Sequence, residues 1–471
     1  MKLTSWWGLT PKQRSATNKV HDIFYPQFQP SIFNALKVLE NTFTVLFAAI
    51  AAKIQDVMQT TFGRCYQVID DSVSEMDAEL TELRRFLHAH PEPSGEEVQT
   101  TRLVLGRLEE AGLEPHICHG GLGLIADLEL GHPAADAPRI AVRADMDALR
   151  LVDEKDVPYA SQNHGVTHAC GHDAHTTITY AAAKTAIQLR AAMAECEPGV
   201  GVKMRFIFQP AEETCEGAKS LVEQGVLKGV DAILALHLDP ERPVGDAGVR
   251  DGFLTANCDE IDFFIQGRGG HAARPHHSID PIAAASQLVG ALYQYIPRSV
   301  DSRDPAVFTV GKILGGYAAN VIPESVELLG TLRTIGRDTR SRIIQRIREI
   351  THGVSESSGV KITVEFRNPL ASVDNDKNIN RLLTQAARDV LGDSHVKQID
   401  KPSMGSEDFG VYLEHVPGAM YRLGCAAPNC PAHFLHSPKF DIDERVLQLG
   451  PRIFLRAALL ISQELKAVSE G

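Results

Sequence analysis

Cysteine is scarce in this sequence and follows no ligand spacing. The chain has 8 cysteines among 471 residues, and they form no repeated Cys-x-x-Cys pair. This scatter excludes a zinc-finger framework and a dense disulfide scaffold, because both need cysteines at regular, close spacing. Such cysteine usage fits a reducing compartment, so we expect a cytoplasmic protein.

Long apolar runs and excess positive charge are lacking as well. The most apolar early stretch, residues 43–52, is far shorter than the roughly 20 residues that cross a bilayer, and it begins too late for an ordinary signal peptide. The 47 lysines and arginines are outnumbered by 60 acidic residues, which gives a net charge of −13. Nucleic-acid-binding proteins usually carry a basic face. We therefore expect neither membrane attachment nor a nucleic-acid partner.

Apolar residues, by contrast, are abundant enough to form complete hydrophobic cores. Hydrophobic residues make up 44% and charged residues 23%, as in globular proteins. A chain of 471 residues exceeds what one core usually organises, so we expect two domains and an appendage. Residues 1–75 contain no recognised motif and are expected to form a helical extension, with an amphipathic helix over 31–62. Alternatively, synthesis starts at Met76 and yields the 396 residues 76–471.

Residues 76–251 and 370–471 are predicted to form one catalytic α/β domain. Strand-like runs near 121, 139, 202 and 231 alternate with helical patterns, which favours a mostly parallel sheet covered by helices. Ligands bind at the carboxyl ends of the strands in such sheets, so we expect ionisable residues at these ends to converge. Three of the runs lead directly into such residues, namely Asp145 and Asp147, Glu212 and Glu213, and His237.

Between residues 252 and 369 the pattern changes to strand, helix, strand, strand, helix, strand. This order is typical of a ferredoxin-like α+β unit. Because the α/β pattern resumes after residue 370, we expect this unit to be inserted whole into the catalytic domain. Sheet edges on the inserted domain would allow a homodimer to form through it.

The densest cluster of metal-binding residue types is HACGHDAHTT, residues 168–177, at the start of a predicted helix. The dipole at a helix N-terminus favours a thiolate, and an imidazole two residues away suits a metal such as zinc. Cys170 and His172 are therefore candidate ligands. A lone buried cysteine is more often a small core residue. Three histidines, an aspartate and a cysteine within ten residues favour a site.

Two adjacent carboxylates follow the strand-like run 202–209. Glu212 and Glu213 lie in the segment FQPAEET, where neighbouring residues of an irregular turn can point in different directions. One carboxylate can then bind a metal while the other faces the water that attacks the substrate. His237 and His436 would each be interpreted as structural if they stood alone, so their assignment depends on the wider pattern.

The combination of these motifs resembles a family of bimetallic amidohydrolases. The family includes aminoacylases, hippurate hydrolases and auxin-conjugate hydrolases, within a wider metallopeptidase group that contains carboxypeptidase G. The resemblance runs from about residue 80 to the end, and its motifs appear in the family's order. They are CGHDAH at 170–175, FQPAEE, ALH at 235–237, GRGGHAARPHHSIDPI and LHSP.

The resemblance implies a two-metal centre with a general base. Two divalent ions, each zinc, manganese, nickel or cobalt, are compatible with the implied ligands. Glu212 matches the general base that takes a proton from metal-bound water, and Asp147 matches a carboxylate that orients a ligand. The family's ligands fall on five residues of this chain: Cys170, His172, Glu213, His237 and His436.

The resemblance also implies substrate contacts. His271, in the GGHA motif of the inserted domain, matches a histidine that stabilises the oxyanion when this domain closes as a lid. Asn320, Arg333, Gly405 and Ser406 match residues near the substrate, and Arg333 is a candidate for binding a carboxylate.

One segment departs from the family's pattern close to the implied metals. TCEGAKSL stands where the family usually has a glycine-rich run, which places Cys215 and Glu216 beside the metal ligands. Either residue could alter metal preference or the shape of the pocket. The departure removes none of the implied ligands.

The implied reaction is hydrolysis of the amide bond of an N-acyl or N-aroyl amino acid to a carboxylic acid and an amino acid. A dipeptidase or carboxypeptidase is the nearest alternative, because the same metals attack any suitably placed amide. Retention of Glu212 and of every ligand argues against a non-catalytic binding protein. A serine hydrolase is disfavoured because the sequence has no GxSxG motif.

Overall fold

The computed structural model describes residues 63–194, 201–428 and 433–469. The expected helix over 31–62 and the apolar stretch 43–52 lie outside these residues. Within them, no helix combines the length and the apolar character that a membrane crossing requires.

A compact unit begins at Cys65, earlier than the predicted boundary at residue 75. Residues 63–75 are helical, and Ile69 and Val73 are fully buried. The carboxylate of Asp70 lies 2.6 Å from the guanidinium of Arg456 in the last helix. The end of the expected extension is thus part of the compact unit, and a chain that started at Met76 would lack these core contacts.

An eight-stranded sheet organises the catalytic domain, in the order β1-β2-β4-β3-β5-β16-β6-β15. Its centre, β4-β3-β5-β16, is parallel, and β6 and β15 also pair in parallel. The predicted mostly parallel sheet is confirmed. The strands are β1 (Pro115–Ile117), β2 (Leu124–Gly131), β3 (Arg139–Asp145), β4 (Gly201–Gln209), β5 (Ala232–Pro243), β6 (Ala247–Val249), β15 (Val396–Gln398) and β16 (Gly418–Ala426).

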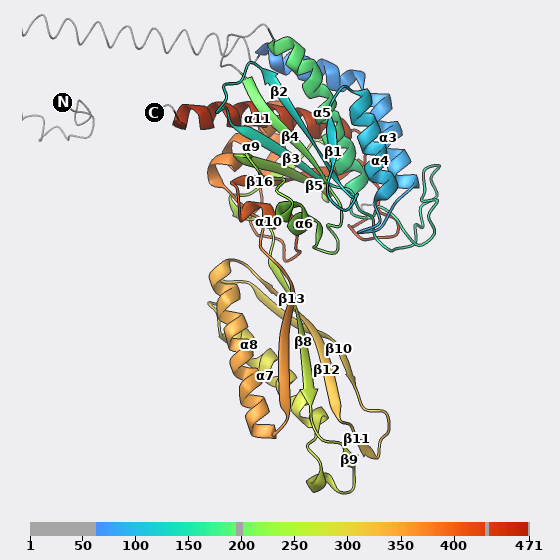
Figure 1. Ribbon diagram of the computed structural model, residues 1–471, viewed down its shortest axis with the longest axis vertical. Helices are drawn as coiled ribbons and strands as arrows, with labels where there is room; N and C mark the ends of the chain where they lie inside the picture. The colour runs from blue at the N-terminus through green and yellow to red at the C-terminus, as the bar shows by residue number, and fades with distance from the viewer. Residues whose placement is uncertain (1–62, 195–200, 429–432, 470–471) are drawn as a thin grey trace, which may run out of the picture. The chain divides into compact units, whose positions relative to one another are not determined.

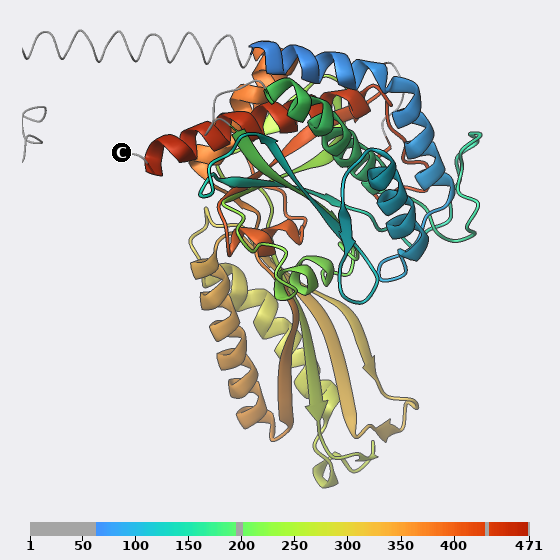
Figure 2. The same cartoon turned by 45° about the horizontal axis from the view of Figure 1, so that its top comes forward.

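Helices cover both faces of this sheet. Ala141 and Ile207 pack with Leu221 of α6 and Phe409 of α10 on one face. In Figure 1 and Figure 2, α5 and α11 lie together along the other face, as alternation of side chains along the strands requires. The helices are α3 (Asp77–Ala89), α4 (Val98–Glu110), α5 (His172–Met193), α6 (Gly217–Glu223), α9 (Lys377–Leu391), α10 (Phe409–Leu413) and α11 (Val446–Ser469), with a 3-10 turn η3 (Asp393–His395).

The strand ends deliver the expected ionisable residues, with one correction. β3 ends at Asp145, and β4 ends three residues before Glu212. His237 does not end its strand, because β5 continues to Pro243 alongside β16. On the other side, β3 pairs with β5 only as far as Ala235. His237 therefore lies just past the last residue of β5 that pairs with β3. It is still at the carboxyl edge of the sheet, where Asp145 and Glu212 lie.

Residues 257–370 form a smaller domain (Figure 1), whose sheet order β10-β12-β8-β13 is antiparallel throughout. The chain passes through strand, helix, strand, strand, helix and strand in the order expected from the sequence. Its main elements are β8 (Asn257–Gln266), α7 (Pro281–Tyr295), β10 (Ala306–Gly315), β12 (Ser325–Thr334), α8 (Arg337–Ser358) and β13 (Lys361–Leu370). Shorter pieces are β9 (Gly270–His271) paired with β11 (Val321–Ile322), β7 (Gly252–Phe253) paired with β14 (Asp374–Asn375), η1 (Pro275–His277) and η2 (Ile296–Arg298).

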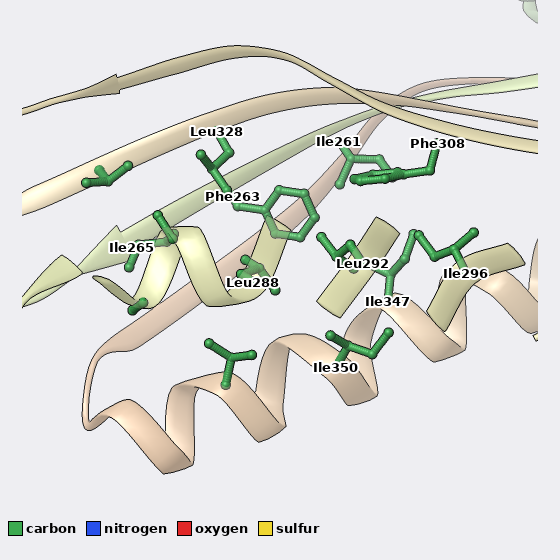
Figure 3. Packing of buried hydrophobic residues seen from close by; sticks show 14 of the residues in the cluster. Ile261, Phe263, Ile265, Leu288, Leu292, Ile296, Phe308, Leu328, Ile347 and Ile350 are labelled. Carbon is green, nitrogen blue, oxygen red and sulfur yellow. The ribbon is translucent and has the colours of Figure 1, made fainter. Parts of the chain in front are cut away.

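A single apolar layer joins the small sheet to its two helices. Figure 3 shows Phe263 of β8 pointing between Leu288 of α7 and Ile347 of α8. On α8 the buried residues Ile343, Ile347 and Ile350 recur at helical spacing, so one stripe of this helix faces the sheet. The other face of the helix is free to carry charge.

Candidate metal centre

A left-handed glycine positions the first two candidate ligands. Gly171 has φ 90° and ψ 13°, and α5 begins at the next residue, His172. A Cβ at Gly171 would lie 3.1 Å from Cδ1 of Leu238, so this position has little room for a larger residue. The turn brings the buried Cys170 and His172 to the same side of the sheet edge.

The loop after β4 is strained, and it places Glu213 near Cys170 and Glu212 near His172. Ala211 and Cys215 have φ of 55° and 63°, values that L residues rarely adopt. The N–H of Gly217 donates to the carbonyl oxygen of Ala211 at 3.0 Å, and a Cβ at Gly217 would lie 1.7 Å from the carbonyl oxygen of Pro210. Glycine is therefore required where this tight loop closes.

The structure brings all five sequence-predicted ligands together in two groups that share Cys170. Cys170, His172 and His237 form one group, with Cys170 Sγ 3.4 Å from His237 Nε2. Cys170, Glu213 and His436 form the other, with His436 Nε2 3.4 Å from Glu213 Oε1. Within each group the ligand atoms all lie within 4.8 Å of one another.

The loop that carries His436 is anchored to the segment that carries Cys170. The N–H of His436 donates to the carbonyl oxygen of Ala169 at 2.7 Å. His436 itself has φ 65°, a further strained position for a residue with a side chain. Three of the four non-glycine residues with positive φ in the described chain, Ala211, Cys215 and His436, thus flank the centre.

The donor atoms fit divalent metal ions. His172 Nε2 and Glu213 Oε1 are buried, lie 3.9 Å apart and have no hydrogen-bond partner among the described residues. Buried polar atoms without partners are costly, and a cation between them would remove the cost. Burial and the negative charge of Glu213 raise the pKa of the Cys170 thiol to about 12, so a metal must displace its proton on binding.

Glu212 lies beside the ligands. One of its oxygens is 4.0 Å from His172 Nε2, and the other accepts a hydrogen bond from the N–H of Asp408 at 3.3 Å. Burial, together with the negative charges of Glu407 and Asp408, raises the pKa of Glu212 well above its ordinary value. A carboxylate with a raised pKa is a stronger proton acceptor than an ordinary carboxylate.

Asp147 connects two of the candidate ligands. One oxygen lies 3.1 Å from His172 Nδ1, and the other accepts hydrogen bonds from Ser94 Oγ at 2.6 Å and from the N–H of Glu213 at 2.9 Å. Burial raises the pKa of Asp147, but the hydrogen bonds and charge of His172 outweigh it and lower the pKa overall. An ionised Asp147 would fix His172 with Nε2 directed toward the metals.

A fully buried arginine behind the centre was not singled out from the sequence. Arg143 of β3 contacts Asp145 at 2.7 Å, Asp408 at 2.6 Å and the side-chain oxygen of Gln209 at 2.8 Å. The sequence feature that could have indicated its role is an arginine flanked by apolar residues within a strand. Its partners come from β3, β4 and the segment before α10, and their proximity depends on the fold.

The two candidate residues at β9 and β11 stand apart from the ligands. His271 is exposed, and its neighbour Ala272 donates its N–H to the carbonyl oxygen of Asn320 at 3.0 Å. In Figure 1, β9 and β11 lie at the end of the small domain opposite to where β8 begins and β13 ends. His271 belongs to none of the candidate ligand groups found among the described residues.

The other candidate substrate residues meet where the two domains join. Arg333 of β12 donates from Nη1 to Ser406 Oγ at 2.8 Å. The carbonyl oxygen of the neighbouring Gly405 accepts the N–H of Ala256 at 3.0 Å, just before β8 begins. Arg333, Gly405 and Ser406 are thus brought together, with the remaining guanidinium donors of Arg333 available to a ligand.

Residues 141–460 match the model of peptidase family M20/M25/M40, which spans more than half of the chain. The chain belongs to this family. An N-acetylcysteine deacetylase of Bacillus subtilis is 37% identical over 392 residues, which cover 82% of this chain and 98% of that protein. An IAA-amino acid hydrolase of Arabidopsis thaliana is 36% identical and covers 82% of this chain and 85% of its own length.

Solved structures agree with this assignment. A Bacillus subtilis protein described as a dinuclear metal-binding peptidase of the M20 family superposes with a TM-score of 0.70 at 33% identity. The match covers 83% of this chain and 99% of that one. The predicted class, a metal-dependent hydrolase of amide bonds, is confirmed.

Proposed function

We propose that this M20 family hydrolase cleaves the amide bond of N-acyl or N-aroyl amino acids at a centre of two divalent metals. The observation that carries the proposal is the meeting of Cys170, His172, Glu213, His237 and His436 in two groups that share one thiol, beside Glu212. The names of two relatives, an N-acetylcysteine deacetylase and an IAA-amino acid hydrolase, describe removal of an acyl group from an amino acid.

Two divalent cations held by these five side chains would polarise the amide carbonyl and lower the pKa of the attacking water. The thiol and imidazoles favour zinc or nickel, whereas the carboxylate tolerates manganese or cobalt.

Glu212 performs the proton transfers in this proposal. Its carboxylate accepts a proton from the attacking water and later donates it to the leaving amine. The buried setting that raises the pKa of Glu212 suits both steps, because the protonated form persists until the amine leaves. Asp147 holds His172 and the backbone of Glu213 in place during the cycle.

The small domain would complete the substrate site. Arg333, next to Ser406 and Gly405, binds the free carboxylate of the amino-acid part, for which a guanidinium is well suited. His271 and Asn320 approach the substrate when the small domain moves as a lid, and His271 then stabilises the oxyanion.

Steady-state rates on a panel of N-acyl amino acids and dipeptides test the proposal, with the Glu212→Gln variant as a blank for contaminating hydrolases. We expect turnover of acyl amino acids that disappears on chelation and returns with added metal. Dipeptide turnover without measurable hydrolysis of any acyl amino acid would instead assign a peptidase function to the same centre.

The predicted homodimer stays a proposal, for which the edge strand β10 is the natural interface. Its outer end and the following turn expose Ile313 by 60% and Tyr317 by 82%. An edge strand with exposed apolar side chains is a common place for pairing with a second chain. Light scattering on the wild type and on an Ile313→Lys variant would test it, since the variant should be monomeric.

A further inference from the structure

Strand β5 extends past the end of β3, so β3 no longer pairs with this last part of β5. β3 pairs with β5 from Ala232 to Ala235, but β5 continues past His237 to Pro243. Leu238 is fully buried in this unpaired stretch. A buried backbone N–H without a partner is costly, so the fold must supply an acceptor for Leu238.

His175 supplies that acceptor. Its Nε2 lies 3.0 Å from the N–H of Leu238, and its Nδ1 lies 2.6 Å from Asp145 Oδ1. Because Nε2 accepts a hydrogen bond, the ring proton belongs on Nδ1, where it is donated to Asp145. Asp145 is held in turn by Arg143 Nη1 at 2.7 Å, and none of the three side chains is more than 1% exposed.

The same residue, Leu238, orients a candidate metal ligand. His237 Nδ1 lies 2.7 Å from the carbonyl oxygen of Leu238, so this nitrogen carries the proton and donates it. His237 Nε2 is then left with its lone pair directed toward Cys170 Sγ, 3.4 Å away. Leu238 is thus anchored at its N–H by His175 and fixes the tautomer of His237 through its carbonyl.

We infer that His175, oriented by Asp145, is a positioning residue that holds His237 in its metal-binding orientation through the backbone of Leu238. The inference rests on the proposed metal centre and assigns a role to two residues that hold no metal themselves. Asp145, His172 and His175 could alternatively form a ligand group of their own, because their atoms lie within 4.8 Å of one another. The engagement of both His175 nitrogens argues against this alternative.

Two substitutions at His175 separate its two hydrogen bonds. In His175→Gln the amide can reach the position of Nε2 and still accept from Leu238, whereas in His175→Asn it reaches only the position of Nδ1 and the contact with Asp145. Zinc is added back to the metal-stripped full-length protein in competition with a chromophoric chelator, which gives both affinities without any assay of activity. We expect Asn to weaken one zinc ion by about 10- to 100-fold, as for other residues that orient metal ligands, and Gln to restore most of the loss.

Three further variants are needed to interpret these zinc affinities. His237→Ala should weaken the same zinc ion at least as much as His175→Asn. His168→Gln is the matched control, because His168 is a fully buried histidine of the same segment whose ring nitrogens have no hydrogen-bond partner among the described residues. It should leave both zinc affinities near the wild-type values. If His175→Asn does not fold, Asp145→Asn takes its place and should weaken the same ion.

Each outcome decides between the possibilities. Wild-type zinc affinity in His175→Asn, with the ion weakened in His237→Ala, overturns the positioning role and leaves the metal centre intact. Equal losses in Gln and Asn would make His175 a ligand and also overturn it. If His237→Ala binds two zinc ions as tightly as the wild type does, the proposed metal centre itself is wrong.

Discussion

The two domains differ in what they bury. Across residues 257–370, all of which the structure describes, Asp259 is the only buried side chain among Asp, Glu, His, Lys and Arg. The remaining described residues bury sixteen such side chains, most of them around the metal centre and behind it. Burying a charge is costly unless it is paired and hydrogen-bonded. The catalytic domain carries this cost around the candidate metal centre, and the small domain avoids it.

Networks rather than single pairs hold the buried charges of the catalytic domain. Arg84 alone reaches Asp173 at 3.0 Å, Asp441 at 2.9 Å and Glu444 at 3.3 Å, which joins α3, α5 and the segment that follows His436. In the small domain the one buried carboxylate, Asp259, meets only Arg340. Substitutions of buried residues should therefore affect metal binding and stability together in the catalytic domain, and stability alone in the small domain.

The largest effect is expected from Glu212→Gln. Removing the proton acceptor should lower kcat by about 10²–10⁴-fold, the usual contribution of general acid–base catalysis, while both metals stay bound. Metal content and steady-state rates measured on the same sample check this. Glu223→Gln, at an exposed position at the end of α6, is the control. A variant at Glu212 with wild-type kcat would show that this carboxylate is not the base.

Arg84→Met should destabilise the protein by about 3–5 kcal/mol, because it leaves the buried Asp173 without its strongest partner. The neighbouring Arg85 is 46% exposed and also contacts Glu444, so Arg85→Met should cost about 1 kcal/mol or less. Denaturant unfolding of both variants makes the comparison. Because Asp173 follows His172, metal affinity should fall only in the Arg84 variant, and equal effects at the two positions would contradict the network.

Leu288→Ala tests the small domain, where it removes a fully buried side chain from the layer between sheet and helices. Destabilisation of about 2–5 kcal/mol is expected from the lost contacts and the cavity. Ile282→Ala, at a position 46% exposed on the same helix, is the matched control and should change little. Metal affinity at 25 °C should be unchanged in both. A loss of metal affinity in Leu288→Ala would mean that packing in the small domain also affects the metal centre.

Local patterns explain how far the sequence could predict this fold. The six main elements of the small domain follow the expected order, because each carries its own periodicity. Cys170, His172 and Glu213 were recognisable because CGHDAH and FQPAEE are contiguous motifs, whereas His237 and His436 were assigned from the family resemblance. Their convergence followed from strand ends meeting at one edge of the sheet.

Residues whose role depends on distant partners could not be predicted in the same way. His175 was part of the CGHDAH motif, but its acceptor role depends on where β3 stops relative to β5. The position of His237 inside its strand depends on β16, which is about 180 residues away in sequence. The roles of Arg143 and Glu97 can be recognised only once it is known that their side chains are buried.

Glu97 is a buried carboxyl group of the catalytic domain that differs from the paired ones, because no positively charged side chain contacts it among the described residues. Its Oε1 accepts the N–H groups of Gly95 at 3.0 Å and Ala211 at 2.8 Å, while Oε2 is buried without a partner. Burial, opposed by these hydrogen bonds and reinforced by the charge of Asp147, raises the pKa of Glu97 to about 7.

The folded protein therefore holds this proton more tightly than the unfolded chain does. The contribution of Glu97 to the free energy of unfolding should fall as pH rises from about 4.5 to about 7, by up to about 3 kcal/mol, and should then level off. Glu97→Gln keeps an acceptor for both amides without the charge, so it should remove this contribution, make the slope less negative by that amount and stabilise the protein at pH 8. Denaturant unfolding between pH 4 and pH 8 checks this, with the exposed Glu96→Gln as control. A slope unchanged in Glu97→Gln would mean that another group carries it.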